Sequence, residues 1–366
     1  MKRETHPLVR IRPGTVTKTI SSRPGVVEVL VKTEDREEKA IAYTAFTGGL
    51  EPGDEVLLNT TAVAKGLGSG GYHFVISRLG RVAADAPDEG HIMKLRYTPL
   101  QIKVLSAEEP ESPYHSLLRE ADSLAGTPVI ALELHSQLAP VAAAVWKRGG
   151  GRFRLVYVMT DGAALPASFS RTVTTLKEKG LLAATVTVGH AFGGDFEAVN
   201  IYSGLLTAKY AGNADVIVAG MGPGVVGTGT RFGTTAIEQG EIVNAAHVLG
   251  GRPVAVLRLS FADPRPRHLG VSHHTLTALG RVALAPATIP VPAMAAEKAA
   301  LVNDQLVSAR VTERHRLVTV DAADTFDSLD ELELRVSTMG RGREAEPEFF
   351  LAAGAAGAIA TELAAV

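Results

Sequence analysis

One short segment, residues 258–274, concentrates side chains that could do chemistry. It contains three arginines, three histidines and one aspartate, in a chain whose formal net charge is only −2. Guanidinium groups bind phosphate and carboxylate in a bidentate way, and an imidazole can gain or lose a proton near neutral pH. We therefore expect an anion site with a histidine acid or base. Its candidate residues are Asp263, Arg265, Arg267, His268, His273 and His274.

The same segment allows two other interpretations. The three imidazoles and the Asp263 carboxylate could bind a divalent metal. The arginines argue against a metal because they raise the local positive potential. Adjacent residues on a helix also point about 100° apart, which disfavours one ion shared by His273 and His274. We therefore assign no metal ligand here and prefer the anion site, and the alternatives are a metal site and a solvated loop or an interface of a homo-oligomer.

A glycine-rich segment follows an apolar run at 215–219. Gly222, Gly224 and Gly227 fit the spacing G-x-G-x-x-G, and Gly229 continues the run. Glycines after a strand let backbone N–H groups approach phosphate oxygens, and a following helix N-terminus adds partial positive charge. A dinucleotide site also needs an acidic residue about 20 positions later, where this chain has His247. We predict a general anion-binding loop, against a purely structural role of the glycines in close packing.

Apolar strands alternate with helices in the part of the chain that carries both segments. Strands are predicted at 129–134, 153–159, 184–188, 215–219, 254–259 and 317–320. Helices are predicted at 136–147, 167–179, 195–210, 234–249, 295–309 and 347–363. Strands of nearly continuous Val, Ile and Leu between helices indicate a Rossmann-like parallel sheet covered on both faces.

Ligands of open parallel sheets bind beyond the carboxyl ends of the strands. Polar or glycine-rich residues follow each predicted strand, which adds Asp161, His190 and Asp195 to the catalytic candidates. The aspartates would orient a histidine that moves the proton, although Asp195 is also typical of a helix N-cap. We expect one shared pocket, lined by Asp161, His190, Gly222, Gly224 and Asp263.

Residues 1–106 have a different character. Short β-rich runs at 26–31, 41–43, 54–58, 72–76 and 101–105, separated by Gly and Pro turns, predict a small β-barrel or sandwich. The charged, proline-containing stretch 107–113 is the expected linker, followed by the α/β domain at 114–366. A length of 366 residues fits this division into roughly two domains.

Composition excludes several classes of function. The chain has no cysteine, which excludes disulfides, thiolate metal sites and cysteine nucleophiles. A pI near 6.6 and 5% aromatic residues argue against nucleic acid and acidic membranes as partners. The N-terminus lacks the apolar core of a signal peptide, and the longest apolar stretches are too short to span a bilayer. We therefore expect a cytoplasmic protein.

Five stretches, residues 66–74, 192–203, 220–233, 259–275 and 337–350, resemble the family known as domain of unknown function 3866. The resemblance implies no activity, cofactor or site residue, because the family is named for lacking an assigned function. From the residues themselves we expect a small-molecule enzyme, of hydrolase or transferase type, that binds an anionic or phosphorylated ligand at the strand ends. The alternative is a non-enzymatic ligand-sensing or assembly protein. A histidine hydrogen-bonded to a carboxylate and facing an open pocket would favour the enzyme.

Overall fold

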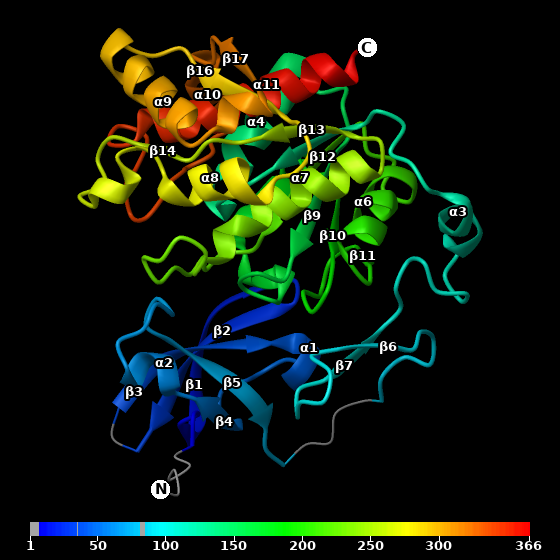
Figure 1. The fold of residues 1–366 in the computed structure, drawn as a ribbon. Coiled ribbons are helices and arrows are strands. Elements are labelled where there is room, and N and C mark those ends of the chain that lie inside the picture. Colours follow the sequence, from blue (N-terminus) through cyan, green and yellow to red (C-terminus); the bar gives the residue numbers. More distant parts are fainter. Residues whose placement is uncertain (1–6, 35, 81–84) are drawn as a thin grey trace, which may run out of the picture. The chain divides into compact units, whose positions relative to one another are not determined.

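The computed structural model describes residues 7–34, 36–80 and 85–366 and divides into two compact units (Figure 1). The first unit comprises Met1–Asp88 and Thr98–Leu100, and the second Glu89–Tyr97 and Gln101–Val366. The segment expected to be a linker, 107–113, lies inside the second unit. Both a side chain and the backbone of this segment find partners there. The Glu108 carboxylate accepts a hydrogen bond from the Val199 N–H at 2.8 Å, and the Ala107 N–H donates to the Glu197 carbonyl at 2.8 Å.

The first unit is a closed barrel with the strand order β1-β2-β3-β5-β4. Every pairing is antiparallel except β3 with β5, which is the arrangement of the Greek-key barrel known as the OB fold. The predicted barrel is thus confirmed. Its elements are β1 (Ile11–Arg23), β2 (Val26–Thr33), β3 (Arg36–Tyr43), α1 (Thr44–Thr47), β4 (Glu55–Asn59), α2 (Thr61–Ala64) and β5 (Tyr72–Arg78).

Strand β1 was not predicted, because it contributes little to the barrel core. Val16 is its one buried side chain, and the other positions are exposed or half-buried. The core is instead built by valines, leucines and alanines of β2 to β5, such as Val29, Ala40 and Leu58. The run predicted at 101–105 forms β7 (Ile102–Val104), which pairs with β6 (Ile92–Lys94) and belongs to the second unit.

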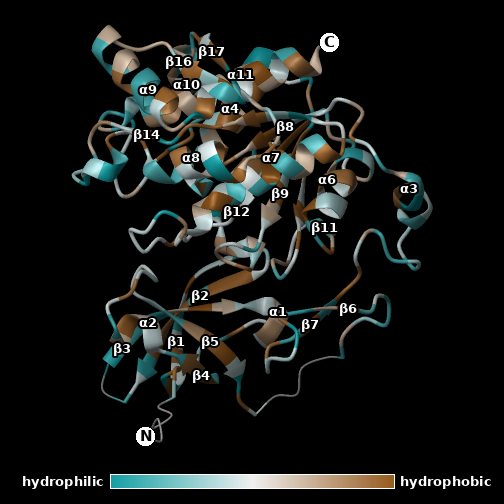
Figure 2. Ribbon diagram, viewed as in Figure 1, coloured by the Kyte–Doolittle hydropathy of each residue, from teal (hydrophilic) through white to brown (hydrophobic). Residues whose placement is uncertain are grey.

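The second unit contains an eight-stranded parallel sheet with the order β11-β10-β9-β12-β8-β13-β16-β17 (Figure 1). The Rossmann-like architecture is confirmed. Figure 2 shows that apolar residues concentrate in the central strands. The strands are β8 (Pro128–Ala131), β9 (Leu155–Thr160), β10 (Ala184–Thr187), β11 (Phe196–Glu197), β12 (Val216–Met221), β13 (Arg252–Ala255), β16 (Thr288–Pro292) and β17 (Arg316–Val320).

Helices cover both faces of this sheet. Helices α4 (Leu138–Gly149), α5 (Arg171–Glu178) and α11 (Pro347–Ala364) bury apolar residues against one face. Helices α6 (Ile201–Tyr210), α7 (Glu238–Val248) and α9 (Ala296–Ser308) share the other core cluster. The smaller elements are α3 (His115–Glu120), the hairpin of β14 (Leu259–Ser260) and β15 (Gly270–Val271), α8 (His273–Thr277) and α10 (Asp324–Glu331). Within the described part of the chain, none of these helices is both long and apolar enough to cross a bilayer.

Strand β16 was missed because its sequence contains two prolines. Pro290 and Pro292 lack the N–H groups that a sheet ladder uses, which normally argues against an interior strand. β16 pairs with β17 along its whole length, but with β13 only where Val254 meets Thr288. The prolines are tolerated because one side of the strand makes few ladder contacts.

Candidate functional site at the carboxyl edge of the sheet

The chain leaves the neighbouring strands β8 and β12 toward opposite faces of the sheet. After β8 it continues into α4 on one face, and after β12 into α7 on the other. Such a reversal opens a crevice at the strand ends in which α/β proteins bind ligands. A cavity of about 330 Å³ lies here. It is lined by Leu134–Ser136, Ala139, Thr172, Gly222–Val225 and Arg335–Met339, and we call it the switch-point cavity.

The wall of this cavity offers groups that suit an anion. Gly224 has a φ of +110°, a conformation that favours glycine, and it turns the chain along the cavity wall. In the described part of the chain, the N–H groups of Gly224 and Val225 donate no hydrogen bond to protein. The Arg335 side chain is exposed and forms no ion pair with any described residue. Two amides and one unneutralised guanidinium thus border the same space.

His135 also lines the cavity and is a functional candidate that the sequence prediction missed. Its Nε2 lies 2.6 Å from the Ser170 hydroxyl, and its Nδ1 lies 3.3 Å from the Tyr157 hydroxyl. Ser170 caps α5 by accepting the Val173 N–H, so its own hydroxyl proton is free to point at His135. Burial lowers the pKa of His135 to about 4, which keeps the imidazole neutral at pH 7. Its position after a predicted strand was the available signal.

The three histidines of the 258–274 segment form one cluster, the tri-histidine cluster. One nitrogen from each of His268, His273 and His274 lies within 4.8 Å of the others. His273 and His274 are the first two residues of α8, and their ring centroids are only 4.1 Å apart. The expected divergence of adjacent helical residues is therefore wrong for these rings. Both turn toward His268, which precedes β15 and lies 5.2 Å from each ring centroid.

A buried ion pair lies next to the tri-histidine cluster. Glu133, just after β8, pairs with Arg258, just after β13, and also accepts a hydrogen bond from the Thr275 hydroxyl. Its carboxylate oxygen Oε1 lies 3.9 Å from Nδ1 of His274. Burial raises the pKa of Glu133, against the opposing effect of Arg258. The sequence signal for Glu133 was a charged residue directly after an apolar strand.

The glycines of the glycine-rich segment lie in two different places in the structure. Gly222 and Gly224 line the switch-point cavity, whereas Gly227 and Gly229 lie beside the 258–274 segment. A Cβ at Gly227 would stand 3.1 Å from Cε1 of His274. Gly222 and Gly224 thus border the cavity and Gly227 does not, because the loop runs on from the cavity to the histidines. Anion binding by these residues stays a prediction.

Asp263 and Arg265 neutralise one another. Two nitrogens of Arg265 contact the Asp263 carboxylate at 2.7 and 2.8 Å, and Arg341 reaches the same carboxylate at 3.2 Å. Arg341 also binds the buried Glu346 at 2.7 Å. The hydrogen bonds from Arg265 hold the pKa of Asp263 well below its usual range. Both side chains serve this salt-bridge network, while Arg267 is exposed and has no acidic partner among the described residues.

Asp161, His190 and Asp195 are not among the residues that line the switch-point cavity, and the pocket expected to be shared by Asp161, His190, Gly222, Gly224 and Asp263 stays a prediction. Asp161 accepts the backbone N–H of His190 at 2.9 Å, and the His190 ring accepts the N–H of Leu95 at 3.0 Å. Asp195 is bound to Thr185 and Lys177. It is not a helix N-cap, because α6 begins later, at Ile201, and is capped by Asn200.

The barrel has a cavity of its own, of about 380 Å³, bordered by Arg10, Arg12 and Arg36. Here His73 lies 3.0 Å from the Glu38 carboxylate. A histidine paired with a carboxylate at a cavity wall is thus found in the first unit. In the described part of the switch-point cavity, His135 contacts hydroxyl groups instead.

One comparison with known proteins gives a match. A family model described as a protein of unknown function (DUF3866) matches residues 39–357. Neither the curated proteins nor the solved structures contain a match to this chain.

Proposed function

This chain belongs to the DUF3866 family, and we propose that it is a small-molecule enzyme, of hydrolase or transferase type, that binds an anionic or phosphorylated ligand in the switch-point cavity. One observation carries the proposal. The free N–H groups of Gly224 and Val225 and the unpaired guanidinium of Arg335 border a cavity of about 330 Å³ at the point where the sheet connections reverse. Oriented amides and a guanidinium stabilise negative charge on a ligand or in a transition state.

The chemistry would come from the contact between Ser170 and His135. A serine hydroxyl at 2.6 Å from a neutral imidazole is the arrangement of an activated nucleophile and its base. The Tyr157 hydroxyl, on the other ring nitrogen, fixes the orientation of the imidazole. Ser170 is buried, so the reaction requires the cavity wall to open near Thr172, which lines the cavity two residues later.

A specific observation favours the alternative, a ligand sensor or assembly protein without chemistry. Both ring nitrogens of His135 are already engaged by hydroxyl groups of the protein, and neither partner is a carboxylate. A pocket built in this way can hold an anion without moving a proton. Ligand binding is common to both functions, and turnover separates them.

Titration calorimetry with inorganic phosphate, pyrophosphate and phosphate monoesters tests the binding. Arg335→Ala should weaken binding about ten- to a hundredfold, because one charge-assisted contact is lost. Arg316→Ala, at an exposed arginine of β17, is the matched control and should bind like the wild type. Equal affinity of the wild type and Arg335→Ala would contradict the assignment of the cavity.

Turnover of p-nitrophenyl phosphate and p-nitrophenyl acetate tests the chemistry. For an enzyme, Ser170→Ala and His135→Ala should abolish turnover while Arg335→Ala raises KM. Phosphate binding without turnover by the wild type would select the alternative function. The cytoplasmic location and the homo-oligomeric state stay predictions from the sequence.

A further inference from the structure

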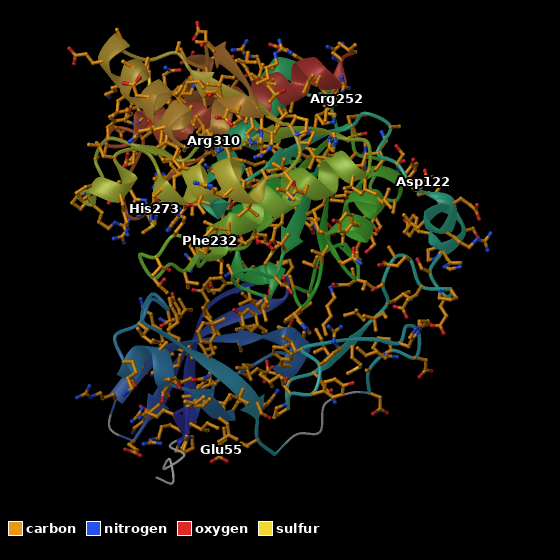
Figure 3. The ribbon with its side chains drawn as sticks, viewed as in Figure 1. Glu55, Asp122, Phe232, Arg252, His273 and Arg310 are labelled. Carbon is orange, nitrogen blue, oxygen red and sulfur yellow. The ribbon has the colours of Figure 1, made fainter. Side chains whose placement is uncertain are left out.

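We propose that His268, His273 and His274 form a binding site for one divalent transition-metal ion of the Zn²⁺ type, with a coordination position left open. The proposal rests on one observation. One nitrogen from each of the three rings lies within 4.8 Å of the nitrogens from the other two. Zinc binds imidazole nitrogen at about 2.0–2.1 Å, so three nitrogens at this spacing can enclose one ion after small ring rotations. Figure 3 labels His273 at the start of α8, where this cluster lies.

The hydrogen bonds of the rings leave nitrogens available for an ion. Nδ1 of His268 is 3.0 Å from the Ser272 hydroxyl, which orients the ring and leaves its Nε2 as the candidate ligand atom. Nε2 of His273 and Nδ1 of His274 are buried and have no hydrogen-bond partner in the described structure. The His274 residue is only 6% exposed. Buried polar atoms without a partner are unfavourable, and a bound ion would satisfy both nitrogens.

Two of the three arginines of the 258–274 segment are neutralised by carboxylates, which lowers the positive potential expected from the arginine content of the segment. Arg258 is paired with Glu133, and Arg265 is paired with Asp263. In the neutral Glu133–Arg258 pair, the carboxylate oxygen Oε1 of Glu133 lies 3.9 Å from Nδ1 of His274. Arg267 is exposed and has no acidic partner among the described residues, and the same holds for Arg231 and Arg281, which border the cavity next to His273.

An open position follows from the surroundings of His273. This residue borders a further cavity, of about 570 Å³, together with Asp304, Gln305 and two arginines, Arg231 and Arg281. Three histidine ligands with a fourth position facing a cavity are typical of zinc ions that bind water or substrate. The proposal is independent of the switch-point cavity, because it is tested with the metal alone.

The test is zinc titration of the untagged full chain after dialysis against a chelator, with Co²⁺ absorption as a second readout. One Zn²⁺ per chain should bind, and Co²⁺ should show the intense visible bands of a four- or five-coordinate site. His273→Ala and His274→Ala should each weaken zinc binding at least ~100-fold, because a direct ligand contributes more than an outer-shell partner. His247→Ala removes an exposed histidine of α7 and is the matched control, with unchanged affinity expected.

Two further variants sharpen the test. Ser272→Ala removes the hydroxyl that orients His268 and should weaken zinc binding about ten- to a hundredfold. Arg267→Ala should bind zinc equally well or more tightly, because a repulsive charge is removed. Circular dichroism checks folding, and His274→Gln replaces His274→Ala if the latter does not fold.

Failure of the folded wild type to bind Zn²⁺, Co²⁺, Mn²⁺ or Ni²⁺ with a Kd below about 10 μM would overturn the proposal. Zinc binding that is unchanged in His273→Ala and His274→Gln would overturn it as well. Loss of phosphate binding in Arg335→Ala bears only on the switch-point cavity.

Discussion

Glu133 and Arg258 form an ion pair across the carboxyl ends of the neighbouring strands β8 and β13, with side chains that are 0% and 6% exposed. The nearest nitrogen and oxygen are 3.3 Å apart. The pair ties the loop that leads to the switch-point cavity to the loop that leads to the tri-histidine cluster. Because both charges are out of water, neither can lose its partner without a large cost.

Glu133→Gln should lower the free energy of unfolding by about 3–5 kcal/mol, because it leaves the Arg258 charge buried and unpaired. The double variant Glu133→Gln/Arg258→Met removes both charges and should recover part of that loss. Urea unfolding of the wild type, Glu133→Gln, Arg258→Met and the double variant measures the effect. If Arg258→Met lowers the free energy of unfolding by the same amount in the Glu133→Gln variant as in the wild type, the two side chains contribute independently to stability. That result would contradict the prediction.

Glu238 should make the stability of the protein depend on pH. It accepts a hydrogen bond from the Thr160 hydroxyl at 2.7 Å, and burial raises its pKa to about 7, with Asp161 and Glu241 adding to the shift. The unfolded chain ionises this carboxyl near its ordinary value of 4.5, so stability falls as the pH rises from about 4.5 to 7 and is level above.

Glu238→Gln should remove that dependence. The variant should be more stable than the wild type by about 1–2 kcal/mol at pH 8, with no gain at pH 4.5. Urea unfolding at the two pH values is the measurement. A variant that loses stability at pH 8 would show that the ionised carboxylate is favourable in the folded protein.

Substitutions at two glycines of one loop, Gly224 and Gly227, should weaken the binding of different ligands. Gly224→Ala places a side chain at a φ of +110° and should cost about 1–3 kcal/mol of stability, and it should weaken phosphate binding at the switch-point cavity. Gly227→Ala places its Cβ 3.1 Å from the His274 ring, and it should weaken zinc binding and leave phosphate binding unchanged. Calorimetric titration of both variants with phosphate and zinc provides the comparison. Equal effects on both ligands would argue that the loop moves as one unit.

The contact between α11 and α4 depends on the absence of a side chain at Gly357. A Cβ there would lie 2.7 Å from the Val141 carbonyl oxygen and 2.8 Å from the Ala144 methyl group. Gly357→Ala should therefore destabilise the second unit by about 1–3 kcal/mol, because the two helices must separate. Gly49→Ala, where nothing lies within 4 Å of the new Cβ, is the control and should stay within about 0.5 kcal/mol. Thermal unfolding compares the two.

Local pattern was enough to predict much of this fold. The apolar runs of β9, β12 and β13 and the alanine-rich α11 follow from hydrophobic periodicity, which each segment carries by itself. The glycine-rich segment and the 258–274 segment could be recognised in the sequence for the same reason, because an unusual composition is a local property. The barrel followed from short β-rich runs between turns. Elements whose residues contradict their structure, such as β16 with Pro290 and Pro292, were not predictable in this way.

Only the tertiary structure decided which strand ends meet. Placing β8 between β12 and β13 brings Glu133 to Arg258 and sets His135 beside Gly224, although these residues are far apart in the chain. That order depends on the path of the connections over the sheet faces, and no local run of residues encodes it. The sequence by itself supplied the histidines and arginines. The folded chain paired Arg258 and Arg265 with carboxylates, because charges removed from water require partners, and it turned the three imidazoles toward one another.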